Sequence, residues 1–501
     1  EKELGITKED IGTKISIEDY NRACRESVMR YTDEWNKLTV KMGYWVNMDD
    51  PYITYDSKYM ESVWWLLGQI YAKDLMYKGY TIQPYSPKAG TGLSSHEINQ
   101  PGAYQDVKDT TCVAQFMVKG DQAVPFANAN LENLYILAWT TTPWTLPSNT
   151  ALTVGPKIDY VLVKSFNQYT HEPIEVVLAK NLVGKQFGKK FEAVDSSEEL
   201  NYKAGDKKIP YTIIGECKGS DLVGIKYEQL LPYALPFEDA DKAFVVIPGD
   251  FVTTEDGTGI VHTAPTFGAD DALVAKAAGV PPLLILDENG KAVPLVDLQG
   301  RFRKEVADPI FGFAGEYVKA EYLEGNEKED ELVIQKENLK AIISDLKAYM
   351  SVDELITLKL KIENRAFNIE KYEHSYPHCW RTDKPILYYP LDSWFIKVAE
   401  NRERLVELNK TINWQPKATG EGRFGNWLAT ANDWNLSRSR YWGIPIPVWT
   451  SEDKSEQICI SSIEQLKSEV QKAVDAGIMK TNPLVEFVSG DMSKANYELV
   501  D

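Results

Sequence analysis

The chain has 501 residues, of which 43% are hydrophobic and 26% charged, and its formal net charge is −19. This composition is ordinary for a globular protein, and the length predicts about two to four domains. No apolar run is long enough to span a membrane and the first residues lack a signal-peptide layout, so neither membrane insertion nor export is predicted. The five cysteines are scattered, which argues against a disulfide framework and indicates a cytoplasmic location.

The first stretch, residues 1–105, is predicted to contain two helices, because apolar residues recur there every three or four positions. The first helix carries Tyr20, Cys24, Val28, Tyr31 and Trp35 on one face. It is expected to begin near Ser16 and Asp19, which are spaced as a capping box. The second helix carries Met60, Val63, Trp64, Leu67, Ile70 and Tyr71, with Gly79 as its predicted stop.

Residues 106–372 have a different pattern, with short β-rich runs that are broken by Gly, Pro and Asn as far as residue 318. The predicted strands include Leu134–Trp139, Tyr160–Lys164, Val176–Ala179, Ala243–Ile247 and Gly259–Thr263. Many short strands in one stretch predict a β-barrel. The charged segment after residue 318 is expected to leave the barrel through an amphipathic helix with Leu339, Ile342, Ile343, Leu346 and Met350 on one face.

Residues 373–450 are aromatic and proline-rich, and residues 451–501 are predicted to be a further mixed α/β segment. An all-β unit between two α/β pieces indicates that one domain is inserted in another. The chain begins at Glu1 and stops at Asp501 without a cap or turn, and we expect both ends to be cuts within a longer protein.

A threonine-rich segment follows the predicted strand that ends at Trp139. Eleven residues from Trp139 to Asn149 read Trp-Thr-Thr-Thr-Pro-Trp-Thr-Leu-Pro-Ser-Asn. The two prolines fix the backbone beside Thr140, Thr141 and Thr142, so these hydroxyls could form a rigid polar rim. An equally good reading, for this segment alone, is a strand end whose hydroxyls are satisfied locally.

A histidine and two aspartates form a second polar group, in the segment from Gly257 to Asp271. His262 ends a predicted strand, and Asp270 and Asp271 follow it within nine residues. A lone histidine is more often structural. The two aspartates are also explained as N-terminal acids of the following helix, where they would meet the positive end of its dipole.

Together the two segments resemble the threonine-rich peptide and the histidine-aspartate loop of the editing domain in class I synthetases for isoleucine, valine and leucine. Three downstream segments resemble the isoleucyl-tRNA synthetases of the type shared by eukaryotes and some bacteria: residues 375–381, 393–395 and 433–447. The resemblance covers nearly the whole chain. It implies an α/β multi-domain fold, with a β-barrel editing domain inserted into a partial Rossmann-like catalytic domain.

On this resemblance, residues 1–105 are an N-terminal piece of the catalytic domain with a connective stem, and residues 106–372 are the editing domain with its helical exit. Residues 373–450 return to the catalytic domain, and residues 451–501 are a further connective segment. Alternatives are a valyl- or leucyl-tRNA synthetase fragment, or a non-catalytic module that binds a tRNA end.

The resemblance also implies the partners and the activity. The partners are the 3′ end of tRNA(Ile) and isoleucine or valine; the negative net charge does not exclude a tRNA end that enters one local cleft. ATP and Mg²⁺ serve the whole enzyme, whereas this chain needs no cofactor. The family's HIGH and KMSKS signatures are missing and Met492-Ser493-Lys494 is a chance fragment, so we expect editing of mischarged Val-tRNA(Ile) without adenylate formation. We expect a monomer.

The same resemblance implies roles for the editing residues. Asp271 binds the α-ammonium group of the mischarged amino acid, with Asp270 the weaker candidate. His262 limits the pocket and bonds the terminal ribose. Thr141 and Thr142 orient the ester and a hydrolytic water.

Three further residues of the threonine-rich segment and three downstream residues complete the expected set. Asn149 supports the loop, and Trp139 and Thr140 contribute to substrate binding. Trp442 is a candidate wall of the isoleucine pocket, with core packing as the even alternative. Arg438 and Arg440 are candidates for contact with ATP or the tRNA end, although surface ion pairing explains them more often.

Many family members hold zinc between two paired-cysteine turns. The corresponding positions here are Ser86, Ala89, Cys379 and Thr382. One thiolate does not make a tetrahedral site, even with His378 nearby, so the sequence predicts no bound zinc.

Overall fold

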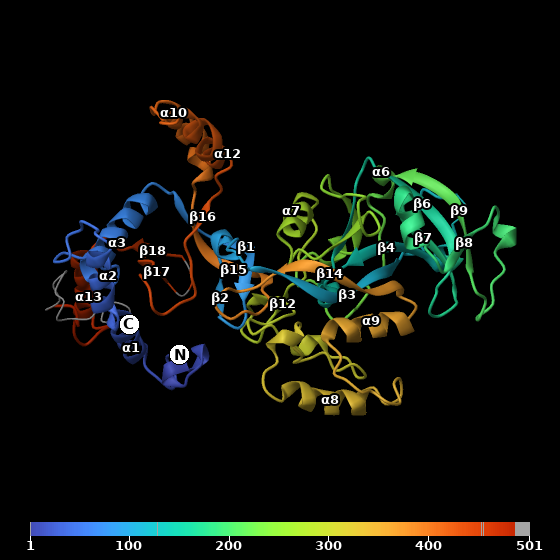
Figure 1. The fold of residues 1–501 in the computed structure, drawn as a ribbon, viewed down its shortest axis with the longest axis horizontal. Coiled ribbons are helices and arrows are strands. Elements are labelled where there is room, and N and C mark those ends of the chain that lie inside the picture. The colour runs from blue at the N-terminus through green and yellow to red at the C-terminus, as the bar shows by residue number, and fades with distance from the viewer. Residues whose placement is uncertain (1, 128, 452, 454, 486–501) are drawn as a thin grey trace. The chain divides into compact units, whose positions relative to one another are not determined.

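The computed structural model describes residues 2–127, 129–451, 453 and 455–485 (Figure 1). Met492-Ser493-Lys494 therefore lies outside the described residues. The chain divides into two compact units. Unit 1 consists of Glu1–Tyr80 and Asp392–Asp501, and unit 2 consists of Thr81–Leu391. The chain passes into unit 2 along strand β1 and leaves it along strand β15.

Unit 1 is mainly helical. Its helices are α1 (Ile17–Met29), α2 (Thr32–Lys41), α3 (Ser57–Tyr71), α10 (Arg402–Lys410), α11 (Lys417–Thr419), α12 (Gly425–Ala429) and α13 (Ile463–Asp475). Its short strands are β16 (Trp434–Asn435), β17 (Val448–Thr450) and β18 (Gln457–Cys459). Among the described residues, no helix is both long enough and apolar enough to cross a membrane.

The single helix predicted through Trp35 is wrong, because α1 ends at Met29 and α2 starts at Thr32. Its N-terminus is confirmed, since the Ser16 hydroxyl accepts the Asp19 N–H at 3.0 Å. The predicted apolar face is exposed at Tyr31 and Trp35. The apolar spacing therefore identified helices here without identifying a buried face.

Helix α3 confirms the second prediction, with Met60, Trp64 and Leu67 buried on one side. Its predicted stop is wrong, because α3 ends at Tyr71 and Gly79 lies inside β1.

Unit 2 contains most of the sheet structure. The strands that lie wholly or, for β1 and β15, partly in this unit are β1 (Met76–Ser86), β2 (Thr91–Gly92), β3 (Tyr104–Met117), β4 (Leu134–Thr140), β5 (Ala151–Val154), β6 (Asp159–Phe166), β7 (Pro173–Ala179), β8 (Phe191–Ala193), β9 (Ile209–Lys218), β10 (Val245–Pro248), β11 (Ile260–Thr263), β12 (Ile285–Leu286), β13 (Ala292–Val293), β14 (Ala366–Pro377) and β15 (Leu387–Ile396). The helices are α4 (Ser95–Ile98), α5 (Val183–Gln186), α6 (Gly219–Leu222), α7 (Ala269–Ala277), α8 (Glu327–Asn338) and α9 (Val352–Ile362). All five predicted strand runs overlap observed strands.

The main sheet has ten strands in the order β10-β5-β11-β4-β7-β6-β9-β8, with β3 pairing to β4 and β14 pairing to β3. The long strands β3 and β14 lie side by side, from Ala114 opposite Ala366 to Tyr104 opposite Pro377 (Figure 1). A barrel requires the two end strands of the sheet to pair. Within the described residues the sheet branches at β4, and its end strands β10, β8 and β14 do not pair with one another, so the predicted closed barrel is not confirmed.

Both faces of this sheet are covered, because successive residues of a strand point to opposite sides. On β6, Val161 and Val163 belong to one apolar cluster, whereas Leu162 belongs to another. The near-continuous apolar runs of β6 and β7 follow from this two-sided burial.

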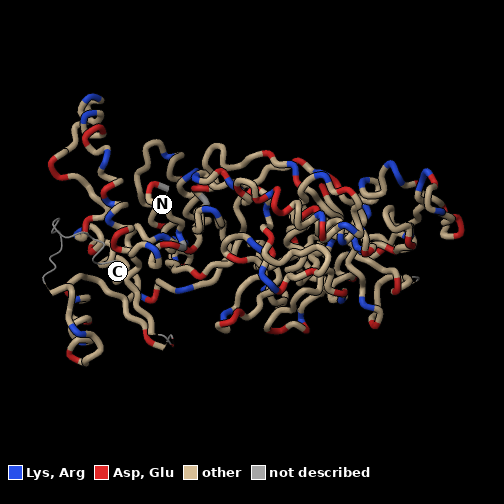
Figure 2. Tube along the Cα trace, turned by 90° about the horizontal axis from the view of Figure 1, so that it is seen from below, with Lys and Arg blue, Asp and Glu red and all other residues tan. Residues whose placement is uncertain are grey.

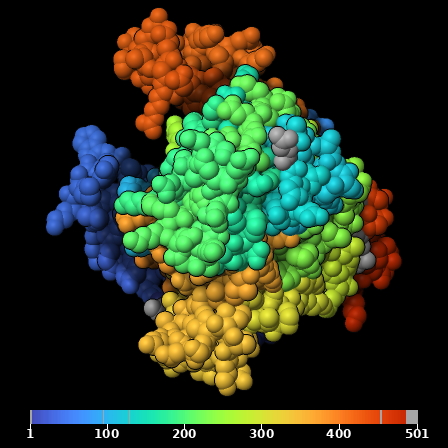
Figure 3. Space-filling model, turned by 90° about the vertical axis from the view of Figure 1, so that its right-hand side faces the viewer, coloured from blue at the N-terminus to red at the C-terminus, as the bar shows by residue number. Residues whose placement is uncertain are grey.

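The helix predicted over residues 339–350 is wrong. Helix α8 ends at Asn338, and the next residues form turns before α9 begins. The Gln335 amide donates to the Met350 carbonyl and accepts the Met350 N–H, both at 2.8 Å, which closes the segment into a loop. Leu339 and Ile342 still pack against the core. In Figure 3 the gold segment with α8 projects at the lower edge of unit 2.

Acidic and basic residues are interspersed along both units, as the tube in Figure 2 shows. The net charge of −19 therefore does not come from one acidic tail.

Candidate active site

The threonine-rich segment and His262 meet in unit 2 because their strands are neighbours. Strand β11 is parallel to β4, with Val261 opposite Trp139, and antiparallel to β5, with His262 opposite Leu152. The ends of two strands more than a hundred residues apart are thus brought to the same edge of the sheet.

After β4 the chain forms a turn and then a 3-10 helix, Pro143–Ser148, whose residues are all buried. The Thr142 N–H donates to the Thr140 hydroxyl at 3.1 Å, and the Thr145 hydroxyl donates to the Thr142 carbonyl at 2.8 Å. Thr140 is buried, whereas Thr141 and Thr142 are half-buried. These local bonds hold the segment in one conformation, and the Thr142 hydroxyl also lies 3.4 Å from the Thr140 hydroxyl.

A chain of hydrogen bonds links this segment to His262. The Tyr227 hydroxyl donates to Asn149 Oδ1 at 2.6 Å, and Asn149 Nδ2 donates to His262 Nδ1 at 2.9 Å. His262 Nε2 lies 3.0 Å from the Thr145 hydroxyl, which itself donates to the Thr142 carbonyl. Since an amide nitrogen can only donate, Nδ1 is the acceptor and Nε2 carries the proton.

The His262 ring is buried, and burial lowers its pKa from 6.5 to about 3. The imidazole is therefore neutral near pH 7, and its only lone pair accepts from Asn149. In this arrangement His262 has no free site with which to abstract a proton. It acts as a rigid spacer whose tautomer is set by its neighbours.

Asp270 and Asp271 lie in the first turn of α7, so the expectation that they begin a helix is confirmed. Burial raises the pKa of Asp271 to about 6; the Ala264 N–H, which donates to Asp271 Oδ2 at 2.8 Å, opposes this rise, and Asp270 adds to it. Asp270 is exposed. A Cβ at Gly268 would lie 2.7 Å from Asp271 Cγ, so only glycine lets the chain pass this carboxylate.

Within the part of the chain that the structure describes, no Lys or Arg pairs with Asp271. A partly buried carboxylate of this kind is suited to an incoming ammonium group, because a positive ligand would offset its desolvation. Asp271 joins the His262 strand through Ala264, two residues beyond the histidine. The structure thus brings His262, Asn149 and Thr145 into direct contact, and Thr145 links them to the Thr142 carbonyl. Asp271 binds the N–H of Ala264, the residue that follows strand β11.

Trp139 is half-buried and meets Tyr372 edge-on, with ring centroids 5.4 Å apart. Trp442, Arg438 and Arg440 belong to the other unit. The Trp442 ring lies 5.7 Å from that of Tyr55. Arg438 is exposed and donates to the Ser437 carbonyl at 2.7 Å.

Sequence reasoning missed four residues of this region: Thr145, Tyr227, Asp353 and Lys319. Thr145 belongs to the threonine-rich segment, but its sequence position alone predicts no contact with His262. Tyr227 lies in no recognisable motif. Asp353 lies within the Ser351-x-x-Glu354 capping box, which predicts a helix start but no distant partner. Burial raises the pKa of Asp353 to about 7, against the opposing effects of Lys319 and the Trp144 N–H.

At the positions considered for zinc, the Ala89 N–H donates to the Ser86 hydroxyl at 3.2 Å, and Cys379 is buried. Burial raises the pKa of the Cys379 thiol, whereas hydrogen bonds with Ser86 and nearby backbone lower it. The hydrogen bonds together outweigh burial, so the pKa lies below its usual value. Of the four positions, Cys379 alone offers a side chain that binds zinc strongly. No cluster of three or more His, Cys, Asp or Glu suited to a metal occurs in the described part of the chain. The absence of zinc stays a prediction.

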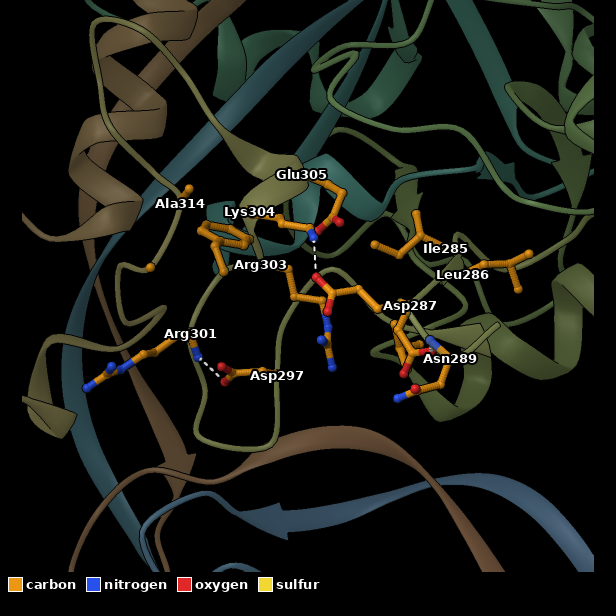
Figure 4. Close-up of a pocket in the computed structure, with 14 residues that line it drawn as sticks. Ile285, Leu286, Asp287, Asn289, Asp297, Arg301, Arg303, Lys304, Glu305 and Ala314 are labelled. Carbon is orange, nitrogen blue, oxygen red and sulfur yellow. Dashed lines mark hydrogen bonds and ion pairs between the residues drawn. The ribbon is translucent and has the colours of Figure 1, made fainter. Parts of the chain in front are cut away.

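A separate cavity of about 780 Å³ lies elsewhere in unit 2 (Figure 4). Its charged lining includes Arg301 and Lys304, and Lys304 pairs with Glu288 at 2.7 Å. Arg303 donates to the Pro294 carbonyl at 2.9 Å. None of the sequence-predicted site residues lines this cavity, so it is distinct from the threonine-histidine group.

Comparison with known proteins bears on the class. Residues 1–498 match the family described as tRNA synthetases class I (I, L, M and V). The chain therefore belongs to this family. It is similar to the isoleucine–tRNA ligase of Cytophaga hutchinsonii, with 63% identity over 478 residues, which are 95% of this chain and 41% of that protein. The isoleucine–tRNA ligase of Bacteroides thetaiotaomicron is 55% identical over 528 residues, 100% of this chain and 44% of that protein.

The chain thus spans less than half the length of these relatives. Among solved structures, it is similar to the P. knowlesi cytosolic leucyl-tRNA synthetase editing domain, with 15% sequence identity and a TM-score of 0.24. That match covers 35% of this chain and 63% of the other.

Proposed function

We propose that this chain carries the editing site of an isoleucyl-tRNA synthetase and hydrolyses valine from mischarged Val-tRNA(Ile). The observation that carries the proposal is the hydrogen-bond chain from Tyr227 through Asn149 and His262 to Thr145, with Asp271 attached to the histidine strand. Family membership and the names of the relatives support the same reading.

Editing is needed because binding energy alone separates valine from isoleucine too weakly. One missing methylene in an apolar pocket is worth only about 1–3 kcal/mol, and the choice between isoleucine and valine by isoleucyl-tRNA synthetases is a well-known example of this general limit. A second site that admits valine and rejects isoleucine removes the error. In our proposal His262, fixed on both sides, forms the rigid wall that excludes the larger side chain.

The mechanism uses positioned polar groups and needs no covalent intermediate. The carboxylate of Asp271 binds the α-ammonium group of the amino acid by a charge-assisted hydrogen bond. The hydroxyls of Thr141 and Thr142, two half-buried residues, orient the ester carbonyl and a water molecule. The water oxygen attacks the carbonyl carbon, the bond from that carbon to the ribose oxygen breaks, and the ribose oxygen takes up a proton, which releases valine and the free tRNA end. Because His262 is neutral and both its nitrogens are engaged, the proton leaves through water or a ribose hydroxyl.

The remaining assignments belong to the same proposal. Residues 106–372 form the editing domain, residues 1–105 and 373–450 are parts of the catalytic domain, and residues 451–501 are a connective segment. Trp139, Thr140 and Asp270 contribute to substrate binding. In the whole cytoplasmic enzyme, which uses ATP and Mg²⁺ to join isoleucine to tRNA(Ile), the other unit supplies Trp442 to the isoleucine pocket and Arg438 and Arg440 to ATP or the tRNA end.

The test compares two substrates. The purified chain should release valine from Val-tRNA(Ile) at least about tenfold faster than isoleucine from Ile-tRNA(Ile), the lower end of what one methylene supplies. Asp271→Ala should abolish release without loss of the folded circular dichroism spectrum. Equal release of both amino acids at the uncatalysed rate would refute the proposal, as would full activity in a folded Asp271→Ala chain.

A further inference from the structure

The threonine-rich segment donates a backbone hydrogen bond to a carboxylate about two hundred residues further along the chain. Its 3-10 helix starts at Pro143, which has no N–H, and Thr142 makes no side-chain bond at this helix start. Trp144 thus presents the first free N–H, and it donates to Asp353 Oδ1 at 2.8 Å. A buried N–H without a partner would be costly, so this bond is a condition for the observed turn.

Asp353 is not required by its own helix. Helix α9 is capped by Ser351, whose hydroxyl accepts the Glu354 N–H, while Glu354 accepts the Ser351 N–H at 2.9 Å. The capping box is complete without Asp353. Its carboxylate takes no part in the α9 cap and accepts the Trp144 N–H instead.

A buried cation compensates this buried carboxylate. Lys319 Nζ lies 3.9 Å from Asp353 Oδ2 and 3.1 Å from Asp109 Oδ2, and both Lys319 and Asp353 are 5% exposed. The ammonium group also lies 4.7 Å from the centre of the Tyr376 ring. An unpaired charge in such a place would be strongly destabilising. The lysine therefore allows Asp353 to be kept inside the unit, and Asp109 ties it to strand β3.

The bond at Trp144 acts on both neighbouring threonines. Thr142 precedes Pro143 and Thr145 follows Trp144 directly, and Thr145 contacts His262 Nε2. A shift of the Trp144 backbone would move the Thr142 carbonyl, the Thr145 hydroxyl and the hydroxyls of the rim together. Small displacements of groups that orient a reacting ester reduce the rate more than they reduce binding.

We propose that Asp353 is a positioning residue for the editing reaction, which fixes the threonine-rich segment by accepting the Trp144 N–H while Lys319 compensates its charge. This inference rests on the proposed function of the same site. Asp353 does not touch the substrate and acts only through the backbone of the segment.

The test uses two substitutions at one position. Asp353→Ala removes the acceptor, whereas Asp353→Asn keeps an amide oxygen for the Trp144 N–H; in both, Lys319 still pairs with Asp109. Asp353→Ala should lower kcat for Val-tRNA(Ile) hydrolysis by about 10- to 100-fold, with KM changed by less than about threefold. Asp353→Asn should restore kcat to within about threefold of the original. The matched controls are Asp345→Ala and Asp345→Asn, at a carboxylate whose side chain is 76% exposed.

A second readout does not depend on activity. Hydrogen–deuterium exchange at the Trp144 amide, resolved to single residues by mass spectrometry, should be at least about tenfold faster in Asp353→Ala and unchanged in Asp353→Asn. If the original chain does not hydrolyse Val-tRNA(Ile), the proposed function fails, and this exchange alone decides whether Asp353 positions the segment.

Folded Asp353→Ala protein with the original kcat, or with unchanged exchange at Trp144, would overturn the inference. If circular dichroism finds Asp353→Ala unfolded, Asp353→Asn decides the question. In that case, an Asp353→Asn chain with the original kcat and the original exchange rate at Trp144 supports the positioning role. An Asp353→Asn chain that loses kcat while its exchange rate at Trp144 is unchanged rejects that role.

Discussion

Asp271 should make unit 2 less stable at neutral pH than it would be with a neutral side chain. Its pKa rises from 3.8 to about 6 on folding, chiefly because the carboxylate is buried. The folded state therefore holds the proton more tightly than the unfolded state, so stability is greatest below pH 3.8 and falls as pH rises through about 6. A shift of roughly two pKa units corresponds to a loss of about 3 kcal/mol at neutral pH.

Asp271→Asn removes this titration and keeps an oxygen that can accept the Ala264 N–H. By proton linkage, about half of this loss of unfolding free energy, about 1.4 kcal/mol, occurs as the pH rises from about 5 to about 8. Relative to the original chain, the variant should therefore gain about 1.4 kcal/mol of unfolding free energy over that interval. It should also lose hydrolysis of Val-tRNA(Ile), because an amide does not replace the carboxylate that binds the α-ammonium group.

The assay is urea unfolding followed by circular dichroism at several pH values, with Asp345→Asn as the control at an exposed carboxylate. The unfolding free energy of the original chain and of Asp271→Asn can be plotted against pH. If the two plots stay parallel from about pH 5 to about pH 8, the reasoning is refuted, because Asp271 then takes up no proton on folding.

Two further predictions concern the hydrogen-bond chain. Asn149→Ala should lower the unfolding free energy by about 2–4 kcal/mol in urea titrations, because it leaves the buried Tyr227 hydroxyl and His262 Nδ1 unpaired; Tyr227→Phe in that background should recover part of the loss, and an additive loss would contradict this coupling. Thr145→Val should slow Val-tRNA(Ile) release by about tenfold in single-turnover assays, since it removes the acceptor that holds His262 Nε2, and an unchanged rate would show that this contact does not contribute.

Local patterns predicted well wherever neighbouring residues decide the structure. The strand runs around Leu134–Thr140 and Ile260–Thr263 were found because their apolar residues are consecutive and bounded by turn formers. The helix start at Ser16 was found because capping depends on residues three positions apart.

Local sequence patterns gave wrong predictions where a contact between distant residues determines the secondary structure or the strand pairing. Residues 339–350 have helical spacing but form turns, because the Gln335 side chain bonds Met350 and the apolar residues reach the core without a helix. The barrel was predicted from the number of short strands and from the resemblance to synthetase editing domains. Strand number does not determine whether β10 and β8 meet, which depends on the pairing of every intervening strand.

The candidate site shows the same division. The threonine-rich segment and the His262–Asp271 segment were identifiable as chemistry-bearing from their composition, and their roles stay predictions. The partners Tyr227, Asp353 and Lys319 were not identifiable, since each lies far along the chain from the residue it supports.

By itself the sequence determined the class of the protein, most of its strands and the residue types available for chemistry, because these depend on local order and on short motifs. Only the tertiary structure decided the tautomer and charge of His262, the raised pKa of Asp271 and the support of Trp144 by Asp353. These properties arise from burial and from hydrogen bonds between segments that the fold brings together, and burial is a property of the packed molecule as a whole.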